Sequence, residues 1–213
     1  MMQRNGEGCF SPGRPGTELL KKIPNNGVFP SWSEIPSEDM RRSAVLVPLF
    51  PSGDTLRILF LRRSPQLSRH GGEICFPGGM KDASDETPLQ TALRETEEET
   101  GIPPGIVKPL LLLPPEYTVV SGVEVFPVLG AVSGIDPERE LVLPPSEISA
   151  AYVVDIACFP AEPRRTEIRF PSLPKGMRGA DGRTVSYPEY DLPDGSVVWG
   201  VTARIMEKVR RLL

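Results

Sequence analysis

The segment from Thr87 to Gly101 carries the clearest helix start and stop signals in the sequence, and it constrains the fold more than any other feature. Thr87 suits the N-cap of a helix, Pro88 the first helical position, and Gln90 the third, where its side chain completes a capping box. Gly101 stands where a glycine commonly ends a helix. The sequence therefore predicts a helix over residues 88–100.

Three acidic side chains are expected on one face of this helix. Glu95, Glu98 and Glu99 are three and four positions apart, so they are neighbours on a helical surface. They lie in the C-terminal half of the helix, where the dipole disfavours negative charge. The run is either a solvated acidic face or a site for a divalent cation, Mg²⁺ or Mn²⁺, that relieves the repulsion. The acidic run alone does not separate these two interpretations.

A pair of glycines precedes the helix, at an expected junction between strand and loop. Phe76 and Pro77 are followed by Gly78 and Gly79, which allow a backbone to approach a ligand closely. A Gly-rich loop, a helix that bears carboxylates and a terminating glycine, in that order, suit chemistry on phosphate with a metal ion. The cation site is therefore the preferred interpretation, and Gly78 and Gly79 are candidate substrate-binding residues.

The order of these residues resembles the Nudix box, the loop-helix-loop motif of the pyrophosphate-cleaving Nudix hydrolases. That motif reads G-x5-E-x7-R-E-U-x-E-E-x-G-U, where U is a bulky aliphatic residue. Here Glu86 is followed by seven residues and then by the run from Arg94 to Ile102, in which Thr96 replaces one aliphatic residue. The first glycine of the motif would fall on Met80; the nearest is Gly79, so the loop is one residue longer.

The resemblance implies a fold and an enzyme class. The fold is a Nudix-type α/β/α sandwich with a central mixed β-sheet, and the box covers about residues 78–102 of a domain at 36–213. The activity is hydrolysis of a pyrophosphate bond with the help of Mg²⁺ or Mn²⁺.

The segment before the box resembles a second motif, which is found in coenzyme A pyrophosphatases. Residues 61–79 are similar to the signature LLTxRSxxLxxHxGxxxFPGGxxD, Asp82 fills its last position, and that branch also carries the longer loop. Residues 42–49, 117–130 and 199–205 resemble further parts of the branch. The likeness implies that the substrate is coenzyme A or an acyl derivative. The products would be 4′-phosphopantetheine, or its acyl form, and adenosine 3′,5′-bisphosphate.

The resemblance also implies roles for the residues of the box. Glu95 and Glu99 would bind the principal cation, and Glu98 would bind a second cation or deprotonate water. Arg94 would pair with a box carboxylate and orient it. Glu86 either reaches a metal through water or is an exposed loop residue.

The identity of the general base stays open at the level of the sequence. In Nudix enzymes it is a Glu of the box or a carboxylate from a later loop. Glu147, beside an expected strand, is the candidate from a later loop, and Glu116 is a weaker one.

A cationic group lies in the upstream motif. Coenzyme A carries a 3′-phosphate beside its pyrophosphate, so an arginine near the glycines has an acceptor. Alternatively, these side chains fix the loop or pair with Glu73 and Asp82. The group consists of Arg62, Arg63, Arg69 and His70, and its three arginines are the candidate substrate-binding residues.

Three side chains in the motifs are expected to be structural. His70 is predicted to be a hydrogen-bonded group rather than a base, and Cys75 a buried side chain rather than a nucleophile. Trp199 is predicted to pack in the core or at the start of a helix.

Composition excludes several classes of protein. Among the 213 residues are one histidine and three widely spaced cysteines, which exclude a zinc site rich in His or Cys and a disulfide framework. The net charge is −4 without a basic block, so nucleic acid is not an expected partner. No apolar run approaches the roughly 20 residues that span a bilayer, and the N-terminus lacks the apolar core of a secretory signal. We therefore expect a cytoplasmic protein that acts on a small nucleotide, either as a monomer or as a homodimer.

Two alternatives remain at this stage. One is a Nudix hydrolase for another nucleotide, such as ADP-ribose, NADH or a dinucleoside polyphosphate. The other is a catalytically silent Nudix module that binds a nucleotide or a partner protein. The complete set of Glu95, Glu98 and Glu99 argues against the silent module.

The rest of the chain predicts short strands and one further helix. Residues 1–35 are rich in Gly, Pro, Ser and Asn and are expected to form a flexible extension that lies against the domain. Residues 159–194 are expected to form a loop that covers the site. Strands are predicted at 43–50, 56–62, 107–114, 124–133, 149–154 and 164–170, and an amphipathic helix at 200–213.

Overall fold

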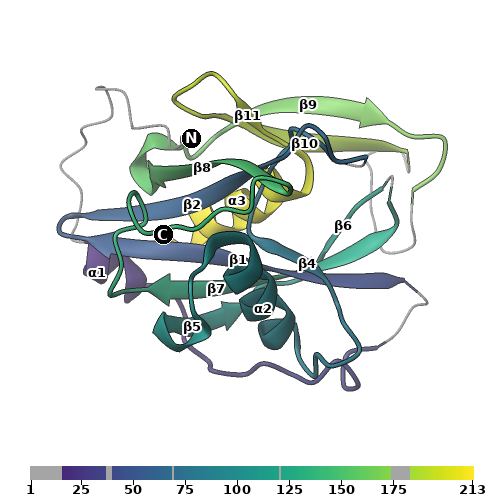
Figure 1. Ribbon diagram of the computed structural model, residues 1–213. Coiled ribbons are helices and arrows are strands. Elements are labelled where there is room, and N and C mark those ends of the chain that lie inside the picture. Colours follow the sequence, from purple (N-terminus) through teal and green to yellow (C-terminus); the bar gives the residue numbers. More distant parts are fainter. Residues whose placement is uncertain (1–15, 37–39, 69, 120, 174–182) are drawn as a thin grey trace.

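The computed structural model describes residues 16–36, 40–68, 70–119, 121–173 and 183–213 (Figure 1). Among these residues, no helix combines the length and the apolar composition that crossing a bilayer requires. The elements in chain order are α1 (Gly16–Leu20), β1 (Arg41–Ser52), β2 (Thr55–Arg63), β3 (Ile74–Cys75), β4 (Gly78–Met80), α2 (Pro88–Thr100), η1 (Pro104–Ile106), β5 (Val107–Leu112), β6 (Glu116–Tyr117), β7 (Val123–Val132), β8 (Ile148–Asp155), η2 (Ile156–Cys158), β9 (Arg164–Arg169), β10 (Thr184–Asp191), β11 (Val197–Val198) and α3 (Gly200–Leu212).

The central sheet is mixed, as the sequence predicted. Its strands follow the order β3-β2-β1-β7-β5, with β8 on β2, β4 on β1 and β6 on β7. β1 and β7 run parallel, with Ala44 opposite Phe126, whereas β1 and β2 form an antiparallel hairpin. A smaller antiparallel sheet contains β9, β10 and β11.

Helices cover both faces of the central sheet, which gives the predicted α/β/α sandwich. Successive residues of a strand point to opposite faces, and here both faces are apolar. Leu59 and Leu61 of β2 pack in the cluster that includes Ala92 of α2. Ile58 and Phe60 pack in the cluster that includes four buried side chains of α3. In Figure 1, α2 accordingly lies in front of the sheet and α3 behind it.

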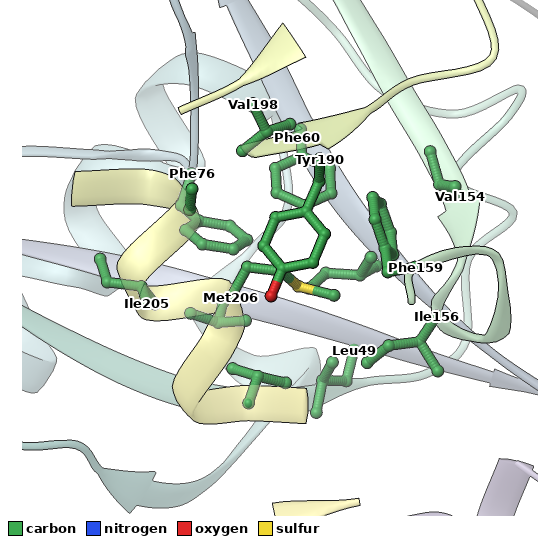
Figure 2. Close-up of a cluster of buried hydrophobic side chains, with 14 of the residues drawn as sticks. Leu49, Phe60, Phe76, Val154, Ile156, Phe159, Tyr190, Val198, Ile205 and Met206 are labelled. Atoms are coloured by element: carbon green, nitrogen blue, oxygen red, sulfur yellow. The ribbon is translucent and has the colours of Figure 1, made fainter. Parts of the chain in front are cut away.

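The core beneath α3 is built around aromatic rings. Tyr190 lies at the centre of Figure 2, and its ring meets that of Phe159 edge-on at 5.6 Å. Phe60 and Phe76 stack at 4.8 Å, and Ile205 of α3 lies beside Phe76. This core ties β2 and the strand before the glycine pair to α3 and to the smaller sheet.

The strands and helices predicted from the sequence are confirmed, with one correction. Residues 159–194 were expected to form a loop, but they contain two paired strands. β9 and β10 run antiparallel, with Val185 opposite Ile168. β9 matches the strand predicted at 164–170. β10 was missed because Pro188 interrupts its apolar alternation, and proline demotes a sequence as a strand candidate.

Much of the segment expected as an N-terminal extension packs against the domain. Ile23 and Trp32 are buried, and the indole of Trp32 donates to the hydroxyl of Thr91 on α2 at 3.3 Å. The guanidinium of Arg42 donates to the carbonyls of Trp32 and Ile35, each at 2.9 Å. Residues 1–15 lie outside the described residues, so the predicted flexibility of that part stays a prediction.

Candidate active site

The helix α2 begins and ends where the sequence predicted. The hydroxyl of Thr87 accepts from the amide of Gln90 at 3.1 Å, and the Gln90 side chain accepts from the amide of Thr87 at 3.1 Å. Gly101 ends the helix in the left-handed region, at φ 72°. Thr96, the departure from the aliphatic residue of the motif, is fully buried, and its hydroxyl donates to the carbonyl of Ala92 at 2.6 Å. Threonine is tolerated there because its polar group is satisfied within the helix.

The glycine pair holds the carboxylates of α2 against the backbone of β4. The amide of Gly78 donates to Oε2 of Glu99 at 3.0 Å. Gly78 has a φ of 153°, and a Cβ there would lie 2.4 Å from the carbonyl oxygen of Ala44. A Cβ on Gly79 would lie 2.3 Å from the carboxyl carbon of Glu95. The sequence predicted that the glycine pair lets a bound ligand approach the backbone. In the structure the carboxylates of Glu99 and Glu95 make this close approach.

This packing predicts different outcomes for alanine at the two glycines. Gly79→Ala should push the Glu95 carboxylate away and lower turnover by about a hundredfold, since a shift near 1 Å at a reacting group has that size of effect. The fold should survive, because the clashing group is the end of a side chain. Gly78→Ala should instead destabilise the domain, because its Cβ meets backbone. Turnover and the midpoint of thermal unfolding of the two variants, measured side by side, check this; equal losses of stability would contradict it.

Arg94 contacts three carboxylates at once. Its Nη1 lies 2.8 Å from Glu95 and 3.4 Å from Glu98, so it pairs with carboxylates of the box as predicted. Its Nε and Nη2 also donate hydrogen bonds to the two carboxylate oxygens of Asp85, at 3.2 and 2.9 Å. The hydrogen bonds to Asp85 raise the pKa of Arg94 above its usual value.

Asp85 is the part of this arrangement that sequence reasoning missed. It is buried, and it also accepts from the amide of Asp82 at 2.9 Å and the hydroxyl of Thr91 at 3.0 Å. Burial opposes its ionisation, but the hydrogen bonds from Arg94, Asp82 and Thr91 keep the pKa of Asp85 below its usual value. Its position nine residues before Arg94 and next to Glu86 is the one signal in the sequence.

Burial destabilises the ionised form of the Glu99 carboxylate. Its side chain is 4% exposed, and burial raises the pKa of Glu99 to about 7, with the charges of Glu95 and Glu147 adding to the rise. The Gly78 amide and the Arg63 guanidinium, 3.5 Å away, offset part of this. Burial likewise raises the pKa of Glu95. Carboxylates that repel one another in a poorly solvated place suit a hard divalent cation.

The other predicted acids lie around this pair. Glu98 is 58% exposed at the outer side of α2. Glu147 is exposed, and its charge adds to the rise in the pKa of Glu99. Its backbone carbonyl accepts from the amide of Ser64 at 2.6 Å, which fixes that loop to β2. In the part of the chain that the structure describes, no three acidic, His or Cys side chains already stand as a closed metal cage.

Two further acids were weaker candidates from the sequence, Glu86 for a metal contact through water and Glu116 for the general base. Glu86 is exposed in the loop before α2. Glu116 is buried in ion pairs with Arg204 at 2.6 Å and Lys208 at 2.7 Å on α3. Glu116 therefore joins β6 to α3.

The two described arginines of the predicted cationic group have different surroundings. Arg63 borders the same cleft as Gly78 and Gly79. Arg62 instead lies over the ring of Tyr152 and pairs with Asp194 at 3.1 Å, which fits the alternative of a residue that fixes a loop. Arg69 lies outside the described residues.

His70 is tied to the neighbouring acid. Its Nδ1 lies 3.0 Å from the carboxylate of Glu73, in agreement with a hydrogen-bonded structural group. Its backbone is in the left-handed region, at φ 58°. Both residues border the cleft beside the glycine pair.

A cleft of about 370 Å³ opens beside the glycine pair. One wall comes from β3 and β4, and the other from β9, β10 and the start of α3. Trp199 borders it and is the N-cap residue of α3, which agrees with the predicted position at the start of a helix. Its 44% exposure excludes the other alternative, a place in the core. Cys75 also borders the cleft, and burial raises the pKa of its thiol to about 12, as expected of a structural residue rather than a nucleophile.

Comparison with known proteins decides the family. The family model of the NUDIX domain matches residues 40–175 of the chain. This chain belongs to the Nudix family. A Nudix hydrolase named NudL, described as uncharacterized, from Klebsiella pneumoniae subsp. pneumoniae is 35% identical over 172 residues, which cover 80% of this chain and 82% of the relative.

Other Nudix proteins show the same relationship. The NudL of Pectobacterium atrosepticum, also uncharacterized, is 44% identical over 98 residues, or 46% of this chain and 50% of the relative. A crystal structure of a MutT/nudix family protein from Enterococcus faecalis superposes with a TM-score of 0.52 over 83% of this chain and 63% of that one, at 17% identity. The fold of this Nudix hydrolase is thus shared, and the glycine pair, Arg94 and the acids of α2 are its box.

Proposed function

We propose that this Nudix hydrolase cleaves the pyrophosphate bond of coenzyme A or acyl-coenzyme A with Mg²⁺ or Mn²⁺. The products are 4′-phosphopantetheine, or its acyl form, and adenosine 3′,5′-bisphosphate. The observation that carries the proposal is the position of Arg63, which belongs to the upstream motif. It lies 3.5 Å from Glu99 of the box and borders the same cleft as Gly78 and Gly79. The two motifs therefore meet in one site.

The residues of the box fit a divalent cation. Glu95 and Glu99 would hold it, with Glu98 as a further ligand, because the buried carboxylate of Glu99 is otherwise compensated only in part. When bound, the cation neutralises charge on the phosphoryl oxygens and lowers the pKa of water. Arg94 anchors Glu95 and Glu98 from one side, while Asp85 fixes Arg94.

The chain supplies two candidate bases for the hydrolysis. A water oxygen attacks phosphorus, its proton passes to a carboxylate, and the bond between phosphorus and the bridging oxygen breaks to leave two phosphate monoesters. Glu98 on α2 and Glu147 on the loop before β8 both carry accessible carboxylates near the box. Arg63 lies where it can bind a phosphate oxygen of the substrate.

A substrate panel tests the proposal. Purified protein is incubated with Mg²⁺ or Mn²⁺ and coenzyme A, dephospho-coenzyme A, ADP-ribose, NADH or a dinucleoside tetraphosphate, and the products are identified by mass. Coenzyme A should give adenosine 3′,5′-bisphosphate with the highest kcat/KM, and a chelator should abolish the reaction. A faster reaction with ADP-ribose, or an unchanged rate without the 3′-phosphate, would reject coenzyme A as the substrate.

A further inference from the structure

Among the described residues, one side of the cleft beside the glycine pair carries no charged side chain. On that side, β9, β10 and the start of α3 contribute the apolar and aromatic side chains Ile168, Phe170, Tyr187, Trp199, Val201 and Ile205. The charged groups that border the cleft among the described residues, Arg63, His70 and Glu73, come from the end of β2 and from the segment that follows it. Polarity is therefore divided between the two sides of one cleft.

The base of the cleft belongs to the rigid core. Phe76 and Ile205 are 2% and 1% exposed, and Figure 2 shows them side by side in the cluster beneath Tyr190. Ile168, Phe170 and Trp199 are less buried and form the outer part of the wall. A ligand group in the cleft would meet a preformed apolar surface, which is the usual character of a small-molecule site.

We infer that this cleft binds the acyl-pantetheine arm of the substrate, and that the enzyme favours acyl-coenzyme A over free coenzyme A. The inference rests on the proposed function and names the part of the substrate that the apolar wall selects. A pyrophosphate bound at Gly78 and Gly79 lies at the edge of the cleft, so a group attached to it extends along the wall.

The chemistry of the wall decides which end of the substrate enters. The nucleoside end carries a 3′-phosphate, whereas Arg63, the described arginine that borders the cleft, lies on β2 beside Glu99 of the box. A phosphate placed against the apolar side chains of β9, β10 and α3 would be desolvated without a partner, which is costly. The pantetheine arm is uncharged and ends in a thioester with an alkyl chain. Its two amides can bond to the hydroxyls that also border the cleft, from Ser43, Thr118, Ser121 and Thr202.

Two variants and one matched control test the inference. Ile168→Asn places a polar group on the outer wall without opening the core, since Ile168 is only half-buried. Trp199→Ala removes an exposed ring from the other end of the wall. Glu167→Gln is the control, because Glu167 is the preceding residue of the same strand and borders a different, polar cleft. All three are made in the otherwise unchanged protein, and a chelator removes divalent cations so that no turnover occurs during the measurement.

Binding of coenzyme A and of its acetyl, butyryl and hexanoyl thioesters is measured by calorimetry in the presence of the chelator. In the unchanged protein and in Glu167→Gln, affinity should rise about three- to fourfold for each added methylene until the cleft is filled. With Ile168→Asn or Trp199→Ala the rise should fall below about twofold.

The outcomes separate this inference from the proposed function. A rise with chain length that the wall variants reduce supports the acyl cleft, even if the active enzyme were to hydrolyse another nucleotide faster. Equal affinity for all thioesters, an unchanged rise in both wall variants, or no binding of any thioester would overturn it. Cleavage of coenzyme A by the active enzyme would still uphold the proposed function in each of those cases.

Discussion

Glu99→Gln and Glu98→Gln should each lower turnover by at least about a hundredfold while the fold survives. Glu99 supplies a buried carboxylate that the Gly78 amide holds in place, and a glutamine there keeps the shape but loses the charge that a cation needs. Glu98 lies on the accessible side of the same helix, as a further ligand or the base. The measurement is kcat at saturating Mg²⁺ for each variant, with circular dichroism as the check of folding. Near-normal turnover in a folded double variant would reject the metal site.

The stability of the metal-free protein gives an independent control for Glu99→Gln. The pKa of Glu99 is about 7 in the folded protein and 4.5 in the reference state, so the folded state binds more protons between these values. The contribution of Glu99 to stability is therefore complete below pH 4.5 and is lost as the pH rises through 7. Glutamine removes this loss, so the variant should gain on the order of 2 kcal/mol relative to wild type between pH 4 and pH 8. A variant that is inactive but shows no such change would indicate that Glu99 is not buried as described.

The order of the box in the chain predicted its geometry because the relevant contacts are local. A capped helix fixes the relative positions of Glu95, Glu98 and Glu99 through the helical repeat alone. The end of the helix was equally predictable, because Gly101 needs only its own left-handed conformation to end it. The short apolar run with β-branched residues at 43–50 likewise predicted a buried strand, and β1 is buried along most of that run.

Apart from the contacts of Asp85, those that sequence reasoning missed are between distant segments. The outer wall of the cleft contains residues of β9 and of the start of α3, which are more than 25 residues apart in the chain. Between them lies β10, whose apolar pattern is interrupted by Pro188. The upstream motif made Arg62 a candidate substrate-binding residue. In the structure its guanidinium instead pairs with Asp194, more than a hundred residues away in the chain. Spacing along the chain carries no information about either partner. The exposure of Trp199 could not be predicted for the same reason.

Asp85→Asn should be the most damaging change outside the acids of α2. Asp85 accepts hydrogen bonds at both oxygens, and each partner there is a donor, from Arg94, Asp82 or Thr91. Asparagine must turn its amide group toward one of these donors, so one buried bond becomes a contact between two donors and the charge opposite Arg94 is lost. We expect a loss of about 2–3 kcal/mol in the free energy of unfolding.

The same substitution should change catalysis through Arg94 and not only through stability. Without its anchor, the guanidinium is free to draw fully onto Glu95 and Glu98, the carboxylates that it already contacts. The Mg²⁺ concentration for half-maximal activity should then rise about tenfold, at a temperature where the variant remains folded, because Arg94 competes with the cation. Glu86→Gln, the neighbouring exposed residue, is the matched control and should change neither quantity by much. A loss of stability with an unchanged dependence on Mg²⁺ would show that Asp85 supports the loop alone, and Arg94 would then need another reason for its place between three carboxylates.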